Sequence, residues 1–330
     1  MTTVRVAAVQ AAPVFLERSA TVDKACALIA EAAGGGAQLV VLPESFVPTY
    51  PDWVWRTRPW DRHATALWTR LVEEAVVVGD AATTALADAA RAAGAVVSVG
   101  VTERDPNGSS LYNTTLLFGP DGALLHRHRK LMPTGAERLV WAQGDGSSLH
   151  AVPTALGRIG TLICWENLMP LARAALYQDG IDIHLAPTWD NSDSWVSTLR
   201  HIAREGRVFV IGVNSCLRGS DVGAHVPGRD ELYGGDDDWM SKGNAAIVAP
   251  DGTVLAGPLV GEAGIVMADL DLDQVRAERQ QFDSAGHYSR RDVLELVVRG
   301  GARPEATSGH APPGHYSSEP MSSAVTPSLP

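Results

Sequence analysis

Short apolar runs alternate with helical patterns along most of the chain, and this alternation restricts the fold more than any other feature of the sequence. Runs of β-branched and apolar residues bounded by turn residues predict strands at residues 3–10, 38–42, 96–102, 114–118, 123–129, 158–164, 183–186, 208–214, 244–249 and 253–256. Apolar residues at helical spacing predict helices at residues 21–33, 73–93, 170–178, 194–205 and 272–280. Helices that fall between strands predict an α/β layered fold.

Two segments depart from simple alternation and have the pattern of β-hairpins. They span residues 111–125 and 243–255, and each carries Pro-Asp-Gly at its turn. Proline presets φ, aspartate accepts a local hydrogen bond and glycine accepts a positive φ, so this tripeptide favours a tight turn. Asn113 and Asn244 open the two segments and are interpreted as hairpin residues. Because the hairpins lie in different halves of the chain, we expect a two-layer sheet arrangement with internal pseudo-symmetry.

Composition narrows the class of protein. The chain has 330 residues and is 45% hydrophobic, which is enough for one large domain or two ordinary ones. Residues 301–330 are rich in Pro, Ser, Gly and Ala, which predicts a disordered or loosely draped tail.

The charge balance argues against two classes of partner. Lys and Arg total 27 against 38 Asp and Glu, for a formal charge of −11. A nucleic-acid binder needs a basic face, and so does a protein that docks on an anionic membrane. No apolar stretch approaches the roughly 18–20 residues of a spanning helix, and the N-terminus lacks the pattern of a signal peptide. We expect a soluble, cytoplasmic protein that binds neither nucleic acid nor membrane.

The three cysteines are widely spaced and include no C-x-x-C pair. This is neither a disulfide framework nor a zinc pattern, so no metal is expected and a reducing compartment is favoured. Cys26 lies within a predicted helix among Ala and Leu and is interpreted as a core thiol. Cys216 follows a predicted strand and is interpreted as structural, with a place near a pocket as the alternative.

Cys164 stands where chemistry is expected. An apolar strand runs directly into it, and Pro170 marks a helix start a few residues later. A cysteine at such a turn is presented near backbone N–H groups and a positive helix end, which lower a thiol pKa and favour the nucleophilic thiolate. The alternative is a small buried hydrophobe.

Two further segments carry charged residues at strand ends. Glu44 follows the buried-type run Val-Val-Leu-Pro, where desolvation would raise its pKa and suit a general base; the alternative is a solvated loop carboxylate. Strand alternation places His126, His128 and Lys130 on one face, and a lysine there could hold negative charge on a developing intermediate. The alternative is a basic edge strand protected against pairing.

Glu44, Lys130 and Cys164 occur in this order within the segments PESF, HRKL and CWEN. Together they resemble the catalytic set of the nitrilase superfamily, the carbon–nitrogen hydrolases, over roughly residues 3–300. Trp165 favours the nitrilase branch, because amidase branches usually carry a small residue after the cysteine. Arg291 departs from the pattern, since nitrilases commonly have Pro there. Further similarity to the nitrilase branch lies in residues 130–147, 164–171, 186–188, 201–206 and 286–290.

The resemblance implies a four-layer α-β-β-α sandwich in a single domain at 1–300, followed by the tail at 301–330. It implies a homo-oligomer, a dimer or an extended spiral, in which α-layers of subunits come together. It also implies a nitrilase that converts an organic nitrile and water to a carboxylic acid and ammonia through a cysteine thioimidate and thioester. No organic cofactor or metal is needed.

The resemblance also assigns roles to residues. Glu44 is the general base, Cys164 the nucleophile, and Lys130 with the backbone N–H of Trp165 stabilises negative charge. Glu137 matches a second family glutamate that positions Lys130 or water.

Aromatic and polar residues near these motifs are the candidate substrate-binding set. Tyr50 and Trp53 follow Glu44 in a Trp-rich segment that walls the pocket or forms a subunit contact. Trp165 belongs to the same set, as do Thr188 and Trp189, which follow a predicted strand.

Three alternatives to nitrile hydrolysis stay open. Within the superfamily the chain could be an amidase, or it could hydrate a nitrile only as far as the amide. From another class, it could be a non-catalytic scaffold that keeps the fold, although an intact Glu44, Lys130 and Cys164 argues against that.

Overall fold

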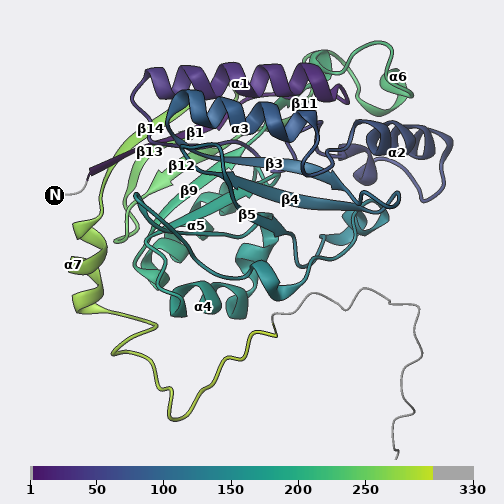
Figure 1. Ribbon diagram of the computed structural model, residues 1–330. Helices are drawn as coiled ribbons and strands as arrows, with labels where there is room; N and C mark the ends of the chain where they lie inside the picture. The colour runs from purple at the N-terminus through teal and green to yellow at the C-terminus, as the bar shows by residue number, and fades with distance from the viewer. Residues whose placement is uncertain (1–2, 300–330) are drawn as a thin grey trace, which may run out of the picture.

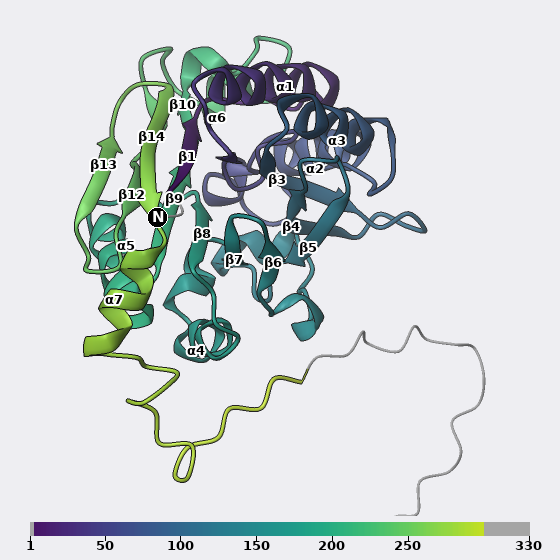
Figure 2. The ribbon, with the colours of Figure 1, turned by 60° about the vertical axis from the view of Figure 1, so that its left-hand side comes forward.

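The computed structural model describes residues 3–299, and the tail predicted at 301–330 lies outside the described residues. Two six-stranded sheets face each other, with helices on their outer surfaces (Figures 1 and 2). This arrangement confirms the α/β class and the layered sandwich.

The first sheet has the strand order β14-β1-β2-β3-β4-β5. Its central strands β1, β2 and β3 are parallel, while β14, β4 and β5 pair antiparallel. The strands are β1 (Thr3–Gln10), β2 (Leu39–Val41), β3 (Val96–Arg104), β4 (Leu111–Phe118), β5 (Leu124–Arg129) and β14 (Gly264–Asp271).

The second sheet repeats this plan, with the order β13-β12-β9-β8-β7-β6 and a parallel centre formed by β7, β8 and β9. The hairpins β4–β5 and β12–β13 take equivalent edges, as the predicted pseudo-symmetry requires. A separate ribbon pairs β10 (Cys216–Arg218) with β11 (Trp239–Lys242). The strands of the second sheet are β6 (Val152–Thr154), β7 (Gly157–Thr161), β8 (Ile183–Thr188), β9 (Phe209–Asn214), β12 (Ala245–Val248) and β13 (Val254–Leu259).

Helices cover the outer face of each sheet. On the first lie α1 (Arg18–Gly34) and α3 (Ala81–Ala93), and on the second lie α4 (Pro170–Gln178) and α5 (Asp193–Gly206). One apolar core fills the space between the sheets, and two others lie between each sheet and its helices. Burial of this surface is the main favourable contribution to folding. The remaining helices are α2 (Arg62–Glu74), α6 (Arg229–Leu232) and α7 (Asp273–Gln281).

The helix predicted at 73–93 is wrong in its first part. Helix α2 ends at Glu74 and α3 begins at Ala81, with an irregular link between them. The side chain of Asp80 accepts a hydrogen bond from the backbone N–H of Thr83 at 3.0 Å, which caps α3. The apolar pattern continues across the link because Val76 is buried there against the end of β3.

Among residues 3–299, no helix combines the length and the apolar character needed to cross a bilayer.

Candidate active site

The four predicted catalytic residues converge at one end of the two sheets, and all are buried. Glu44 follows β2 and Lys130 follows β5 in the first sheet, whereas Cys164 follows β7 in the second. Glu137 lies in the short 3-10 helix Gly135–Leu139. Chain reversals at strand ends therefore bring together side chains that are far apart in sequence.

Lys130 binds both glutamates. Its Nζ donates to Glu44 Oε1 at 2.9 Å and to Glu137 Oε2 at 2.8 Å. Burial alone would lower the lysine pKa, but the negative charges of Glu44, Cys164 and Glu137 more than offset this and hold the pKa above its usual value. Lys130 is therefore a fixed positive charge in a site shielded from water.

Glu44 has one occupied and one available oxygen. Its Oε1 accepts from Lys130 and from Asn113 Nδ2, the latter at 2.7 Å, whereas Oε2 has no hydrogen-bond partner among the described residues. Burial raises the pKa of Glu44, although Lys130 opposes the rise. A carboxylate with a raised pKa and a free buried oxygen is suited to accept a proton.

Cys164 occupies a strained position at the start of the short 3-10 helix Cys164–Leu168, which follows β7. Its φ is 53°, in the left-handed region that non-glycine residues rarely adopt. Such a conformation costs about 1–3 kcal/mol and persists where neighbouring contacts fix it. Asn167 supplies such contacts, because its Nδ2 donates to the carbonyl oxygens of Leu162 at 2.8 Å and of Cys164 itself at 2.9 Å. The strain presents the thiol towards Thr188, whose Oγ1 donates to Sγ at 3.2 Å.

The expectation of a lowered thiol pKa is wrong. Burial, reinforced by the charge of Glu44, raises the pKa of Cys164 to about 12, and the nearby Lys130 offsets this only in part. Full desolvation penalises the thiolate more than one ammonium group stabilises it. The thiol of Cys164 therefore keeps its proton at neutral pH.

Tyr50 contacts both Glu137 and two tryptophan side chains. Its Oη donates to Glu137 Oε1 at 2.7 Å and accepts from Trp55 Nε1 at 3.1 Å. Its ring stacks on Trp189 with 4.3 Å between centroids. The structure therefore places Thr188 against Cys164 and Tyr50 against Glu137, while Trp189 reaches the site through its stack on Tyr50.

Trp165 and Trp53 lie elsewhere. Trp165 is 48% exposed, and its Nε1 donates to Asp190 Oδ2 at 2.9 Å. Trp53 is buried and packs edge-on against Phe15, with 6.3 Å between ring centroids. Trp165 thus lies on the exposed side of the 3-10 helix that begins at Cys164, while Trp53 faces a core cluster.

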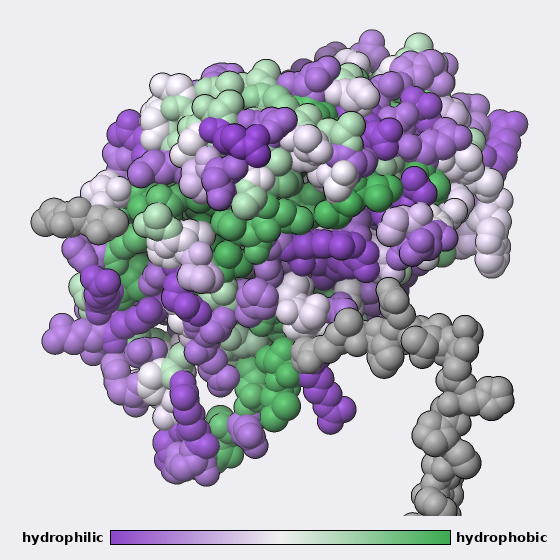
Figure 3. All heavy atoms as spheres, viewed as in Figure 1, coloured by the Kyte–Doolittle hydropathy of each residue, from purple (hydrophilic) through white to green (hydrophobic). Residues whose placement is uncertain are grey.

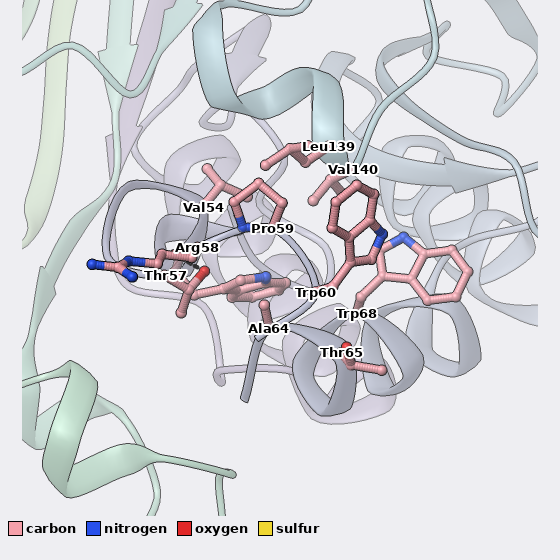
Figure 4. A pocket seen from close by; sticks show the side chains of 11 residues that line it. Val54, Thr57, Arg58, Pro59, Trp60, Ala64, Thr65, Trp68, Leu139 and Val140 are labelled. Atoms are coloured by element: carbon pink, nitrogen blue, oxygen red, sulfur yellow. Dashed lines mark hydrogen bonds between the residues drawn. The ribbon is translucent and has the colours of Figure 1, made fainter. Parts of the chain in front are cut away.

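Trp53 also borders a cavity of about 300 Å³, which Figure 4 shows beside Trp60, Trp68, Leu139 and Val140. None of the four predicted catalytic residues lines this cavity. The Trp-rich segment is therefore divided into two parts. Tyr50 and Trp55 are hydrogen-bonded in a chain that leads to Glu137, whereas Trp60 and Trp68 line the separate cavity.

Comparison with known proteins agrees with this geometry. The sequence profile of the carbon–nitrogen hydrolases matches residues 5–280. The chain belongs to the carbon–nitrogen hydrolase family. An aliphatic nitrilase from Sinorhizobium fredii is 45% identical to it over 305 residues, which cover 90% of this chain and 96% of the relative.

Two plant relatives belong to the same branch of this family. Nitrilase 1 from Arabidopsis thaliana is 40% identical over 317 residues, covering 93% of this chain and 90% of the relative. A bifunctional nitrilase/nitrile hydratase from Nicotiana tabacum is 41% identical over 305 residues, covering 90% and 86%. This carbon–nitrogen hydrolase is therefore a nitrilase-branch protein.

A solved structure supports the fold alone. Nit3 from Saccharomyces cerevisiae, a member of the nitrilase superfamily, aligns with a TM-score of 0.69 at 20% identity, covering 87% of this chain and 97% of that one. The likeness confirms the nitrilase-type sandwich.

Asn113 lies in the β4–β5 hairpin, as predicted, but its contact with the site was not predicted. It lies inside β4, and its amide contacts a carboxylate 69 residues away in sequence. A polar amide within the apolar run of β4 was the available signal. The contact gives one oxygen of Glu44 two hydrogen-bond donors, Asn113 and Lys130.

The other two cysteines lie apart from the four predicted catalytic residues. Cys26 is half-buried on α1, with Sγ 3.7 Å from the carbonyl oxygen of Ala85. Cys216 is buried at the start of β10, and burial raises its pKa to about 11. Neither shares a hydrogen bond with Glu44, Lys130 or Cys164 in the described part of the chain, so both serve as comparison positions for Cys164.

Proposed function

We propose that the protein is a nitrilase that hydrolyses an organic nitrile to the carboxylic acid and ammonia. The observation that carries the proposal is the buried Glu44–Lys130–Glu137 cluster beside a protonated thiol, with one oxygen of Glu44 free. The nitrilases at 40–45% identity over most of the chain support it.

The first half of the reaction forms a carbon–sulfur bond. Glu44 Oε2 takes the proton of Cys164, and Sγ attacks the nitrile carbon as one π bond of the nitrile opens. The proton passes to the nitrile nitrogen and gives a thioimidate. Lys130 and the backbone N–H of Trp165 stabilise the charge that develops on nitrogen, and they act strongly because the site is desolvated.

The second half uses two waters. Glu44 removes a proton from the first water, whose oxygen adds to the thioimidate carbon, and passes this proton to nitrogen. The remaining hydroxyl proton is then transferred to nitrogen as the carbon–nitrogen bond breaks, so that ammonia leaves and a thioester remains. A second water, activated in the same way, breaks the carbon–sulfur bond and releases the acid while the thiol regains its proton. Glu137 holds Lys130 in place through both steps. Side chains, backbone and water supply all the groups that this scheme needs.

Amide formation is the second candidate outcome. If the carbon–sulfur bond breaks in the first tetrahedral intermediate, the product is an amide and the reaction is a hydration. The Nicotiana relative is described as bifunctional in this sense, which supports keeping the possibility for this chain. In an amidase, Sγ would attack the amide carbonyl carbon, ammonia would leave to give the thioester, and one water would then release the acid.

A panel of benzonitrile, phenylacetonitrile and butyronitrile tests the proposal. We expect acid and ammonia in equal amounts from at least one nitrile, with amide as a minor product. The Tyr50–Trp189 stack, with Trp165 on the exposed side, favours aryl or arylaliphatic substrates through ring contacts. Chromatography of acid and amide with an ammonia assay provides the measurement. Turnover of amides alone would show an amidase, and no turnover of either would show a scaffold.

Asn113 is expected to set the acid limit of activity. Its hydrogen bond lowers the pKa of Glu44, so Asn113→Leu should raise that pKa further. The base is then ionised only at higher pH. The acid limb of the kcat/KM profile should move upward by about one pH unit, so kcat/KM at a given pH on that limb should fall about 10-fold.

The control for Asn113 is Thr115→Val on the same strand. Thr115 is buried, and its Oγ1 has no hydrogen-bond partner within residues 3–299. The profile of this variant should overlay that of the wild type. An unchanged acid limb in Asn113→Leu would contradict the role given to the amide.

Exposed apolar side chains support a homo-oligomer formed through the helical layers. Leu168, Met169 and Leu171 are exposed where α4 begins, the last of them by 69%. Val293, Leu294 and Val297 are exposed on the extended segment after α7, where Figure 3 shows hydrophobic atoms on the surface. Such a surface is typical of a subunit contact. Light scattering of the full chain tests whether a dimer or a longer assembly forms.

The cytoplasm is the proposed compartment. All three cysteines are free, which fits a reducing environment. The formal charge of −11 continues to argue against nucleic-acid and anionic membrane partners.

A further inference from the structure

One buried carboxylate touches the backbone beside two catalytic residues. Glu166 Oε1 accepts from the backbone N–H of Leu131 at 2.6 Å, and its Oε2 accepts from that of Ile163, also at 2.6 Å. Leu131 directly follows Lys130, and Ile163 directly precedes Cys164. Glu166 therefore bonds to the chain next to the charged lysine and next to the nucleophile.

The two bonded segments belong to different sheets. Lys130 extends from β5 in the first sheet, and Cys164 follows β7 in the second. Among the described residues no hydrogen bond joins these two side chains directly. The distance between the ammonium group and the thiol therefore depends on how the two sheets are aligned at this end. Glu166 is hydrogen-bonded to the backbone that follows β5 in the first sheet and to the backbone that follows β7 in the second.

Glu166 is held in its charged form. His128 Nε2 lies 2.9 Å from Oε2, and Ser148 Oγ lies 2.9 Å from Nδ1 of the same ring. Burial alone would raise the carboxyl pKa, but His128 and the two backbone N–H groups more than offset this and keep the pKa of Glu166 below its usual range. A charged acceptor makes hydrogen bonds about twice as strong as a neutral one.

We propose that Glu166 is a positioning residue that fixes Lys130 relative to Cys164 by clamping the backbone beside each of them. It touches no reacting atom. Its effect arises because a misplacement of about 1 Å at a reacting group can cost roughly 100-fold in rate. The kinetic consequence rests on the proposed nitrile hydrolysis, whereas the geometric consequence for the thiol does not.

The decisive variant is Glu166→Gln, which keeps the shape and removes the charge. One of its polar atoms becomes an NH₂ group that faces a backbone N–H, so one side of the clamp is lost. We expect kcat for the best nitrile to fall about 100-fold and KM to change less than about threefold, since positioning acts on the reacting groups and not on substrate affinity. Alkylation of Cys164 by iodoacetamide at pH 8, followed by peptide mass spectrometry, should slow at least about 10-fold because the thiol and its activating charges are no longer aligned.

Glu103→Gln is the matched control. Glu103 is also a buried carboxylate with a lowered pKa, but it binds the side chains of Arg127, Arg129 and Thr114 and not the backbone beside a catalytic residue. This variant should lose thermal stability while keeping kcat and the alkylation rate of Cys164 within about threefold of wild type.

Glu166→Asp provides a second variant in case Glu166→Gln does not fold. It retains the charge but is shorter by one methylene, so it should recover part of the alkylation rate and of kcat. Rates for Glu166→Gln within threefold of wild type, or equal losses in Glu103→Gln, would overturn the proposal. If the wild type hydrolyses no nitrile, the alkylation rates still test the clamp, so the two failures are distinguishable.

Discussion

Replacing Cys164 with alanine will lower kcat for nitrile hydrolysis by at least about 10⁴-fold while leaving the fold intact. The variant has no sulfur atom to form the carbon–sulfur bond. Any remaining reaction would be direct attack of water on the nitrile, helped only by the charges of Glu44 and Lys130. Alanine keeps the Cβ and therefore bears the same left-handed strain at φ 53°. Ammonia release measures the loss, and a thermal midpoint within a few degrees of wild type shows that the fold is retained.

The other two cysteines provide the controls for this variant. Cys26→Ala and Cys216→Ala remove the same sulfur atom at half-buried and buried positions away from the site. Both should keep kcat within about twofold, whereas Cys164→Ser should stay close to the alanine variant, because a hydroxyl is a harder group to deprotonate. Near wild-type turnover by Cys164→Ala would refute the assignment of the nucleophile.

The positions of Glu44 and Cys164 were predictable because each ends a buried strand. An apolar run that changes abruptly to a charged or nucleophilic residue marks the strand end, and parallel strands present their carboxyl ends at one edge. The paired hairpins predicted the repeated plan of the two sheets. Alternation along β5 likewise predicted the buried faces of His126, His128 and Lys130, which the structure confirms.

The partners across the site were not predictable in the same way. Asn113 reaches Glu44 only through the register of β3 against β4, and Glu166 reaches Leu131 across two different sheets. The sequence around each residue does not indicate that Asn113 lies close to Glu44 or that Glu166 lies close to Leu131. The prediction of a lowered thiol pKa was wrong for a related reason. This pKa depends on the full burial of Cys164 and on charges that distant segments bring close to it.

The helix predicted at residues 73–93 was wrong where a local hydrogen bond competes with the continuous apolar pattern. Alanine-rich sequence favours helix over residues 81–93, whereas residues 76–80 read Val-Val-Val-Gly-Asp, which are weaker helix formers. The cap at Asp80 and the burial of Val76 on the sheet break the segment at this point. The strand β14 was also missed, because alternating burial is weak along it and its pairing partner β1 lies at the other end of the chain.

Replacing Lys130 with methionine will damage both activity and stability. Methionine has a similar length and no charge, so two buried carboxylates would face each other without the ammonium group that binds both. Breaking a buried ion pair by removing one partner costs about 3–5 kcal/mol. Loss of the charge that stabilises the intermediate should lower kcat about 10³-fold. Urea unfolding and ammonia release measure the two effects.

The stability deficit of Lys130→Met should depend on pH. Lys130 lowers the pKa of Glu44, so its removal raises that pKa further above the ordinary value of 4.5. The folded variant then binds a proton that the unfolded chain has released, and its stability falls as pH rises through this window. The deficit relative to wild type should be smallest below about pH 4.5 and should reach its full size above the raised pKa.

The double variant Lys130→Met/Glu137→Gln separates charge repulsion from lost packing. It removes one of the two carboxylates, so it should regain about 1–2 kcal/mol of stability at pH 8 while recovering none of the activity. Met132→Ala, on an exposed side chain of the same loop, should change neither quantity by much. Equal unfolding free energies for wild type and Lys130→Met at pH 8 would mean that the ion pairs make no net contribution, and Lys130 would then be retained for chemistry alone.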